Sequence, residues 1–122
     1  MALSRLAEAF AAEIRNHDWS DAPWRADRAG HDRSNDSNRV GQQFQLPPDE
    51  TATVRLNVMW VTAQVLAYMD PNFDVYEFAE AAGVNTRTPS GRERSGHIRA
   101  GLRTLNGQYC RPGTWHPPAG AF

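Results

Sequence analysis

The chain has 122 residues, of which 40% are hydrophobic, and its formal net charge is −1. This length predicts one domain with a substantial core, and the overall charge names no partner. The single cysteine, Cys110, excludes an internal disulfide, and no leader or transmembrane run is present, so we expect a soluble cytoplasmic protein that does not contact a membrane.

An N-terminal helix is predicted within residues 1–16. Ser4 is suited to be its N-cap. We expect its larger apolar side chains to form the face that packs on the rest of the core. That predicted row is Leu3, Leu6, Phe10 and Ile14, with Ala7 and Ala11 beside it.

Residues 17–48 form a long polar loop in which the apolar periodicity disappears. A connection of this length between helices is either functional or disordered. It holds two His-Asp pairs, His17-Asp18 and His31-Asp32, of a kind that can build a hydrolytic metal site if they converge. Solvated loop charges explain the pairs better, because no helix or strand fixes the distances between them. The acidic, tryptophan-bearing part, residues 18–36, is a candidate surface for a protein partner.

A central helix is predicted over residues 49–69, beginning at the Pro47-Pro48 pair and ending before Pro71. Apolar residues occupy most of its circumference, which is typical of a helix contacted from several sides. We therefore expect it to be buried. The first apolar row is Val54, Val58, Val61, Val65 and Tyr68. The second is Leu56, Trp60, Ala63 and Ala67.

Two further helices are predicted in the C-terminal third. The first follows Asp74, which has capping-box spacing to Glu77, and ends at Gly83. The second runs from Ser90, with the same spacing to Glu93, to about residue 105. Two very short strands about Pro112-Gly113 are expected next, and residues 117–122 form an irregular tail.

Together, residues 74–116 resemble a winged helix-turn-helix unit. The stretch FDVYEFAEAAGV matches the positioning helix, GRERSGHIRAGLRTLNG the recognition helix and QYCRPGTW the wing. The resemblance covers about a third of the chain, and the turn at 84–89 is longer than the family's usual three or four residues. It implies a mainly α-helical single domain that binds double-stranded DNA.

The charges support the same partner. Residues 1–83 hold seven arginines and thirteen acids, a net charge of −6, whereas residues 84–122 hold six arginines and one acid, a net charge of +5. Such a split is typical of a chain with an anionic partner. All thirteen basic side chains are arginine. A GC-rich genome is the simpler reason, and the preference of arginine for phosphate and guanine is the other.

On the predicted last helix, Arg92, Arg99 and Arg103 lie near one line, roughly 115° from the apolar row. Such a line can contact phosphates or guanine edges, or it can be a solvated helix face. Residues at the start of that helix, with Arg111 on the wing, would add phosphate contacts. The predicted DNA-binding residues are Thr86, Arg87, Ser90, Arg92, Arg94, Arg99, Arg103 and Arg111.

The sequence therefore predicts a non-enzymatic DNA-binding protein, a small regulator or accessory factor, with no catalytic residue, metal or cofactor. A homodimer that reads two half-sites, formed through the first or the central helix, is the expected assembly. Two alternatives remain open. One is a protein-interaction module that uses residues 18–36, and the other is a metal-dependent hydrolase that uses both His-Asp pairs.

Overall fold

The computed structural model describes residues 3–29 and 44–116. Within them the chain is mainly helical, as expected, with one small antiparallel sheet. No helix in these ranges is long and apolar enough to cross a membrane. The elements are α1 (Arg5–Asn16), α2 (Pro48–Met69), α3 (Val75–Ala81), α4 (Gly96–Ala100), β1 (Thr104–Leu105) and β2 (Gln108–Tyr109).

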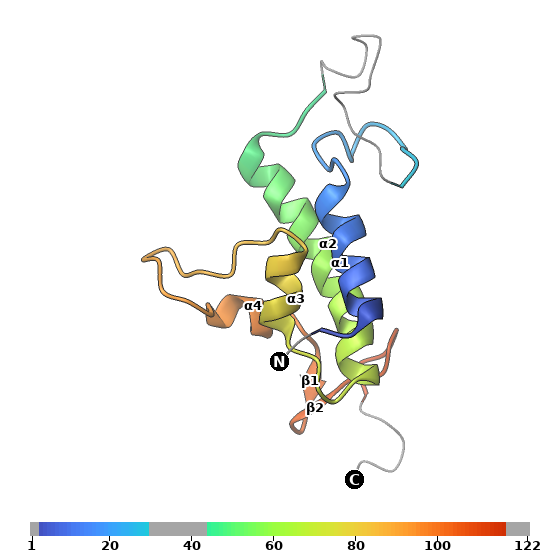
Figure 1. Cartoon of the computed structure of the whole chain (residues 1–122), viewed down its shortest axis with the longest axis vertical. Coiled ribbons are helices and arrows are strands. Elements are labelled where there is room, and N and C mark those ends of the chain that lie inside the picture. Colours follow the sequence, from blue (N-terminus) through green and yellow to red (C-terminus); the bar gives the residue numbers. More distant parts are fainter. Residues whose placement is uncertain (1–2, 30–43, 117–122) are drawn as a thin grey trace.

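Helix α2 runs along the length of the molecule, and the other elements pack around it (Figure 1). It contacts α1, α3 and β2. Its ends lie where the prolines predict them, since Pro48 is its first residue and Asp70, before Pro71, is its C-cap. Helix α2 is contacted from several sides, as predicted, but it is not buried throughout, since Val61 is 73% exposed and Met69 70%. The helices in residues 3–29 and 44–116 are too few to enclose α2, so these residues leave one side of its C-terminal half exposed.

Helix α1 begins as predicted, with the Ser4 hydroxyl accepting a hydrogen bond from the Ala7 N–H at 3.1 Å. Its packing face is the predicted one only in part, since Ile14 is buried and Leu3 packs against the core, but Leu6 and Phe10 do not. The small residues Ala7 and Ala11 are buried, while Leu6 is 60% exposed and Phe10 43%. Both rows fit the helical period, and the alanine row allows a closer approach to α2 and α3 than large side chains would.

Helix α3 has the predicted ends. The Asp74 carboxylate accepts the N–H groups of Tyr76 at 2.8 Å and Glu77 at 3.4 Å. Gly83 follows the helix with φ +83°, a conformation that glycine adopts without strain. Phe78, in the middle of the helix, is fully buried against α1 and α2.

Helix α4 is much shorter than the predicted helix from Ser90 to residue 105. Its N-cap is Ser95, whose hydroxyl accepts from the His97 N–H, and its C-cap is Gly101. Gly91 and Arg94 have φ of +91° and +57°, which no α-helix contains. The Gly91 N–H donates to the Thr88 carbonyl, so turn chemistry around Pro89 prevails over the capping-box spacing.

The hairpin also lies elsewhere than predicted. Strands β1 and β2 pair Thr104 with Tyr109 about an Asn106-Gly107 turn, whose φ angles of +55° and +77° are the signature of a type I′ turn. Around Pro112-Gly113 there are no strands. Instead, residues 111–116 close into a loop through a hydrogen bond from the Arg111 N–H to the His116 carbonyl at 2.8 Å. We call these residues the C-terminal loop.

Candidate nucleic-acid interface

The segment between α3 and α4, residues 84–95, projects from the helical body (Figure 1). We call it the arginine loop, since it holds Arg87, Arg92 and Arg94. Its base is closed by the Ser95 N–H, which donates to the Thr86 carbonyl at 2.8 Å. The Thr86 hydroxyl is buried and donates to Glu80 at 3.0 Å. Thr86, predicted as a phosphate contact, therefore holds the base of the loop.

The arginine loop is ordered by its own hydrogen bonds. The Thr88 hydroxyl accepts the Arg92 N–H at 2.9 Å and lies 3.0 Å from the Ser90 hydroxyl. The Arg87 guanidinium donates to the Gly91 carbonyl at 3.0 Å and lies 3.7 Å from Glu93. The segment has no apolar core of its own, so these hydrogen bonds fix its backbone. The backbone positions of its arginines are therefore defined.

Two arginines flank one tyrosine where the loop meets α4. The guanidinium carbons of Arg94 and Arg99 lie 5.1 and 5.6 Å from the centre of the Tyr76 ring. Arg94 also lies 3.5 Å from Asp74, and the Tyr76 hydroxyl donates to the Ser95 carbonyl at 3.1 Å. Cation–π contacts of this kind contribute about 0.5–1 kcal/mol at exposed sites. Tyr76 thus fixes the base of the loop and positions two cationic side chains.

Arg92 differs from these. It is exposed, and its guanidinium makes no hydrogen bond or ion pair with any other residue in ranges 3–29 and 44–116. Its charge is therefore available to a ligand.

The predicted arginine line does not exist, because its three members lie on different elements. Arg92 is in the arginine loop, Arg99 is on α4, and Arg103 lies between α4 and β1. Arg103 is engaged: its Nε donates to the Thr114 carbonyl at 2.9 Å, and its guanidinium lies 5.2 Å from the centre of the Trp115 ring. Arg103 therefore orders the C-terminal loop, and Arg111 lies exposed within that loop.

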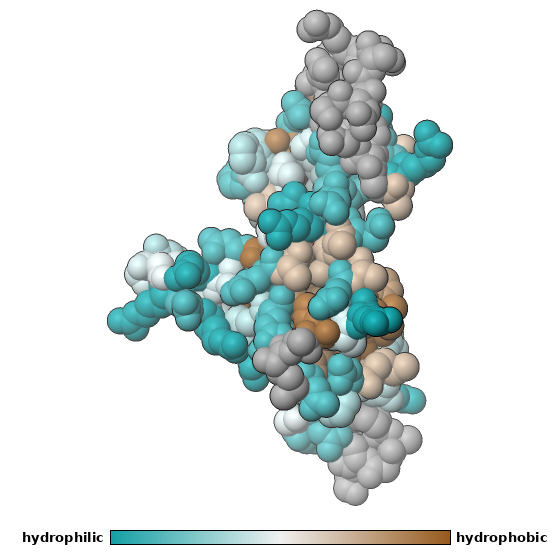
Figure 2. All heavy atoms as spheres, in the orientation of Figure 1, coloured by the Kyte–Doolittle hydropathy of each residue, from teal (hydrophilic) through white to brown (hydrophobic). Residues whose placement is uncertain are grey.

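The surface of the arginine loop and α4 is hydrophilic and basic (Figure 2). Residues 84–116 contain six arginines and one acid, Glu93. That acid lies 3.7 Å from Arg87. Thus Arg87, Arg92, Arg94 and Arg99 share one region of the molecule, and Arg103 and Arg111 lie in another.

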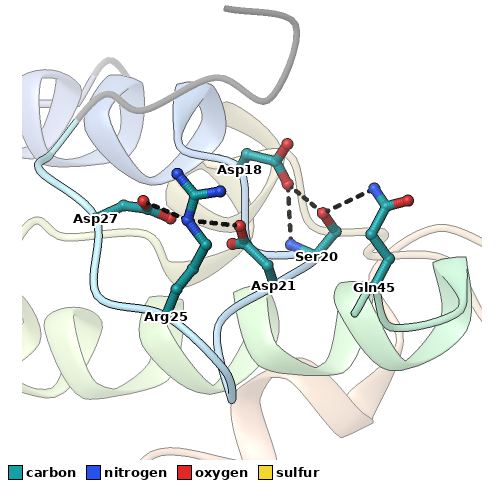
Figure 3. A network of polar contacts seen from close by, with 6 residues as sticks. All are labelled: Asp18, Ser20, Asp21, Arg25, Asp27 and Gln45. Atoms are coloured by element: carbon teal, nitrogen blue, oxygen red, sulfur yellow. Dashed lines mark hydrogen bonds and ion pairs between the residues drawn. The ribbon is translucent and has the colours of Figure 1, made fainter. Parts of the chain in front are cut away.

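In the described part of residues 18–36, the acidic side chains do not neutralise the arginines of the arginine loop and α4. Figure 3 shows that Asp21 and Asp27 both contact Arg25, at 3.3 and 2.9 Å. Asp18 accepts from the Ser20 N–H at 2.9 Å and from its hydroxyl at 2.6 Å. These contacts lie by the C-terminal end of α1 and the N-terminal end of α2, away from α4 (Figure 1). The described acids therefore stabilise their own loop.

The described residues do not support the alternative of a metal-dependent hydrolase that uses both His-Asp pairs. His17 packs against Trp19, with ring centres 4.3 Å apart, and His31-Asp32 lies outside the described ranges. Within those ranges no three His, Cys, Asp or Glu side chains group as metal ligands would.

Two side chains of α2, Trp60 and Gln64, position this region, a role that was not predicted from the sequence. The Trp60 Nε1–H donates to the Ile98 carbonyl at 2.8 Å, which connects α2 to α4. The buried Gln64 accepts the Arg103 N–H at 2.7 Å and donates to the carbonyls of Arg103 and Cys110, both at 3.1 Å. A polar amide one turn after a tryptophan, in an otherwise apolar stretch, was the available signal.

Comparison of the chain with protein-family models, with curated proteins and with solved structures finds no match.

Proposed function

We propose that this protein is a non-enzymatic DNA-binding protein that contacts the duplex through the arginine loop and α4. The observation that supports this most is the ordered, projecting loop, whose Arg92 is unpaired among the described residues. Arginine neutralises phosphates and releases condensed counterions, which is the main source of affinity in such complexes. Arg94 and Arg99, held beside Tyr76, would add further phosphate contacts.

The proposal keeps the order of a winged helix-turn-helix unit, with α3 before α4 and the β1–β2 hairpin after them. It differs from such a unit in which element makes most of the DNA contacts. Helix α4 has five residues, about 7.5 Å of length, and that is too short for a recognition helix lying along a major groove. The arginine loop would therefore make most contacts, and because phosphates carry no sequence information, we expect weak sequence preference.

The test is fluorescence anisotropy with a labelled duplex of arbitrary sequence across a salt series. The double variant Arg92→Ala/Arg99→Ala should bind roughly tenfold more weakly, with a salt slope smaller by about two, one for each lost phosphate contact. The matched control is Arg5→Ala/Arg28→Ala, which removes the same charge from two exposed residues elsewhere. Equal loss in both variants, or no binding of the wild-type protein at low salt, would contradict the proposal.

A second candidate function is a protein-interaction module, and one observation favours it. Trp24 and Phe44 lie 5.9 Å apart between ring centres, and both are about half exposed, an arrangement typical of residues that partners bury. A photo-crosslinking amino acid placed at position 24 or at position 92 separates the two functions. Crosslinks to DNA from position 92, with none to protein from position 24, would reject this candidate.

A further inference from the structure

Two arginines from different helices lie against Gly83, just after α3. A Cβ built on Gly83 would lie 3.3 Å from Cγ of Arg15 and 3.6 Å from Cδ of Arg55. Arg15 belongs to the last turn of α1, and Arg55 belongs to α2. Because glycine has no side chain, the stems of both arginines can pass close to it, and two positive charges come to one corner of the fold. We call Arg15 and Arg55 the corner arginines.

The corner arginines have no counterion within the residues that the structure describes. Neither forms a hydrogen bond or an ion pair with any of them. On α2 the positions three and four residues away from Arg55 carry no acid, so a pair along its own helix cannot form. Glu80, three residues before Gly83, accepts the Thr86 hydroxyl at 3.0 Å instead.

Arg55 is the member of this pair whose position requires an explanation. Arg15 is exposed and lies at a helix C-terminus, where a cation is favourable without any ligand. Arg55 is partly buried, and its Nε is fully buried with no acceptor among the described residues. Unsatisfied buried donors are rare in native proteins, and a bound ion is one of their usual reasons. A partly desolvated charge without a counterion costs stability, so this corner favours an anion.

We propose that the corner arginines bind a phosphate group beside Gly83. The terminal nitrogens of Arg55 are not buried, so an anion can reach them. Guanidiniums from two helices approach a ligand from different directions, which suits the tetrahedral oxygens of phosphate better than a planar carboxylate. This inference goes beyond the proposed function, because a phosphate group can bind here whether or not the protein binds duplex DNA.

The experiment is a titration of the full, isotope-labelled chain with inorganic phosphate, with the ionic strength held constant by sodium chloride. Nuclear magnetic resonance should show saturable shifts of the Gly83 amide and the Arg55 Nε–H, with a dissociation constant on the order of millimolar. Acetate should cause much smaller shifts. Arg55→Gln should abolish the saturable shift of the Gly83 amide. Arg5→Gln, which removes an exposed arginine at the other end of α1, should leave it unchanged.

Melting temperatures separate a binding role of Arg55 from a structural one. Without phosphate, Arg55→Gln should melt no lower than the wild type, because the lost charge had no partner among the described residues. Phosphate should raise the melting temperature of the wild type and not that of the variant. The proposal is overturned by a wild-type Gly83 amide that does not respond to phosphate, or that responds equally to acetate. An unchanged response in Arg55→Gln overturns it as well.

Duplex DNA then identifies the source of the phosphate group. If Arg15→Gln/Arg55→Gln binds a labelled duplex severalfold more weakly, with a smaller salt slope, the group belongs to the DNA backbone. If duplex affinity is unchanged while phosphate binding is lost, the ligand is a free phosphate or a small phosphate ester. Both results support the site. Failure of the wild-type protein to bind duplex DNA counts only against the proposed function.

Discussion

The indole of Trp60 lies directly against Gly101. A Cβ built on residue 101 would stand 1.9 Å from Cε2 of the Trp60 ring, and the same indole donates to the Ile98 carbonyl at 2.8 Å. The ring therefore occupies the space that a side chain at position 101 would need, at the point where α4 ends. This contact sets the position of α4, and with it that of Arg99, relative to α2.

We expect Gly101→Ala to destabilise the protein by about 2–4 kcal/mol, because the ring must shift and its hydrogen bond is then lost. Urea unfolding followed by circular dichroism measures this free energy. Gly96→Ala is the matched control, since a Cβ there meets nothing within 4 Å, and it should be neutral or slightly stabilising. Equal stability of the two variants would show that the ring moves aside at little cost.

Gln64→Leu should lower the free energy of unfolding by about 2–4 kcal/mol. The substitution fills a similar volume but leaves the Arg103 N–H and the carbonyls of Arg103 and Cys110 without their partners. Hydrogen exchange should show loss of protection at the β1–β2 hairpin. Thr62→Ala is the control on the same helix, because the Thr62 hydroxyl contacts only its own helix, at the Val58 carbonyl. A small effect at Gln64, like that at Thr62, would contradict this role.

Gly107→Ala should destabilise by about 1–2 kcal/mol, since φ of +77° places a Cβ in a strained conformation. Thermal unfolding and the chemical shifts of Thr104 and Tyr109 report the change. Gly113→Ala is an informative comparison, with φ of +76° in the C-terminal loop. It should disturb Trp115 fluorescence and leave the hairpin shifts in place. If the chemical shifts of Thr104 and Tyr109 changed in Gly113→Ala but not in Gly107→Ala, the result would favour the hairpin predicted about Pro112-Gly113 over the observed one.

Arg92→Ala should lower DNA affinity but not stability, whereas Arg103→Ala should lower stability. Loss of Arg92 should weaken DNA binding severalfold with no change in melting temperature, because its guanidinium has no partner in the described part of the chain. Loss of Arg103 should lower the melting temperature, because two carbonyls and the Trp115 ring lose their contact. Anisotropy titration and calorimetry on both variants test this. Equal effects of the two on DNA affinity would contradict the division of roles.

Elements whose ends depend on local chemistry were predictable from the sequence. Proline fixes both ends of α2, and the side chains of Ser4 and Asp74 cap α1 and α3 by bonds that span three residues or fewer. Failures occurred where two local signals competed. Glu93 has capping-box spacing to Ser90, yet the turn at Pro89-Ser90-Gly91 forms instead. Asn106-Gly107 is the stronger hairpin signal of the chain, but strands of two residues show no alternation that would identify them.

Which apolar row of a helix is buried could not be predicted from the sequence. On α1 the row containing Ala7 and the row containing Leu6 both have helical spacing, and only the contacts of α1 with α2 and α3 decide between them. Similarly, six arginines could be counted in residues 84–122, but whether Arg92, Arg99 and Arg103 form a line depended on the length of α4. Arg103 illustrates this, since its part in ordering the C-terminal loop requires Thr114 and Trp115 at their positions in space.

The closure of the arginine loop at Thr86 and Ser95 has a consequence for how the chain can diverge. Because this pair holds the ends of α3 and α4 together, residues inserted or deleted between Pro89 and Glu93 would change how far the loop extends without moving either helix. Loop length costs little entropy once the ends are fixed, about 0.6 kcal/mol for each doubling. The reach of the basic surface, and hence the shape of the ligand it fits, can therefore evolve independently of the core.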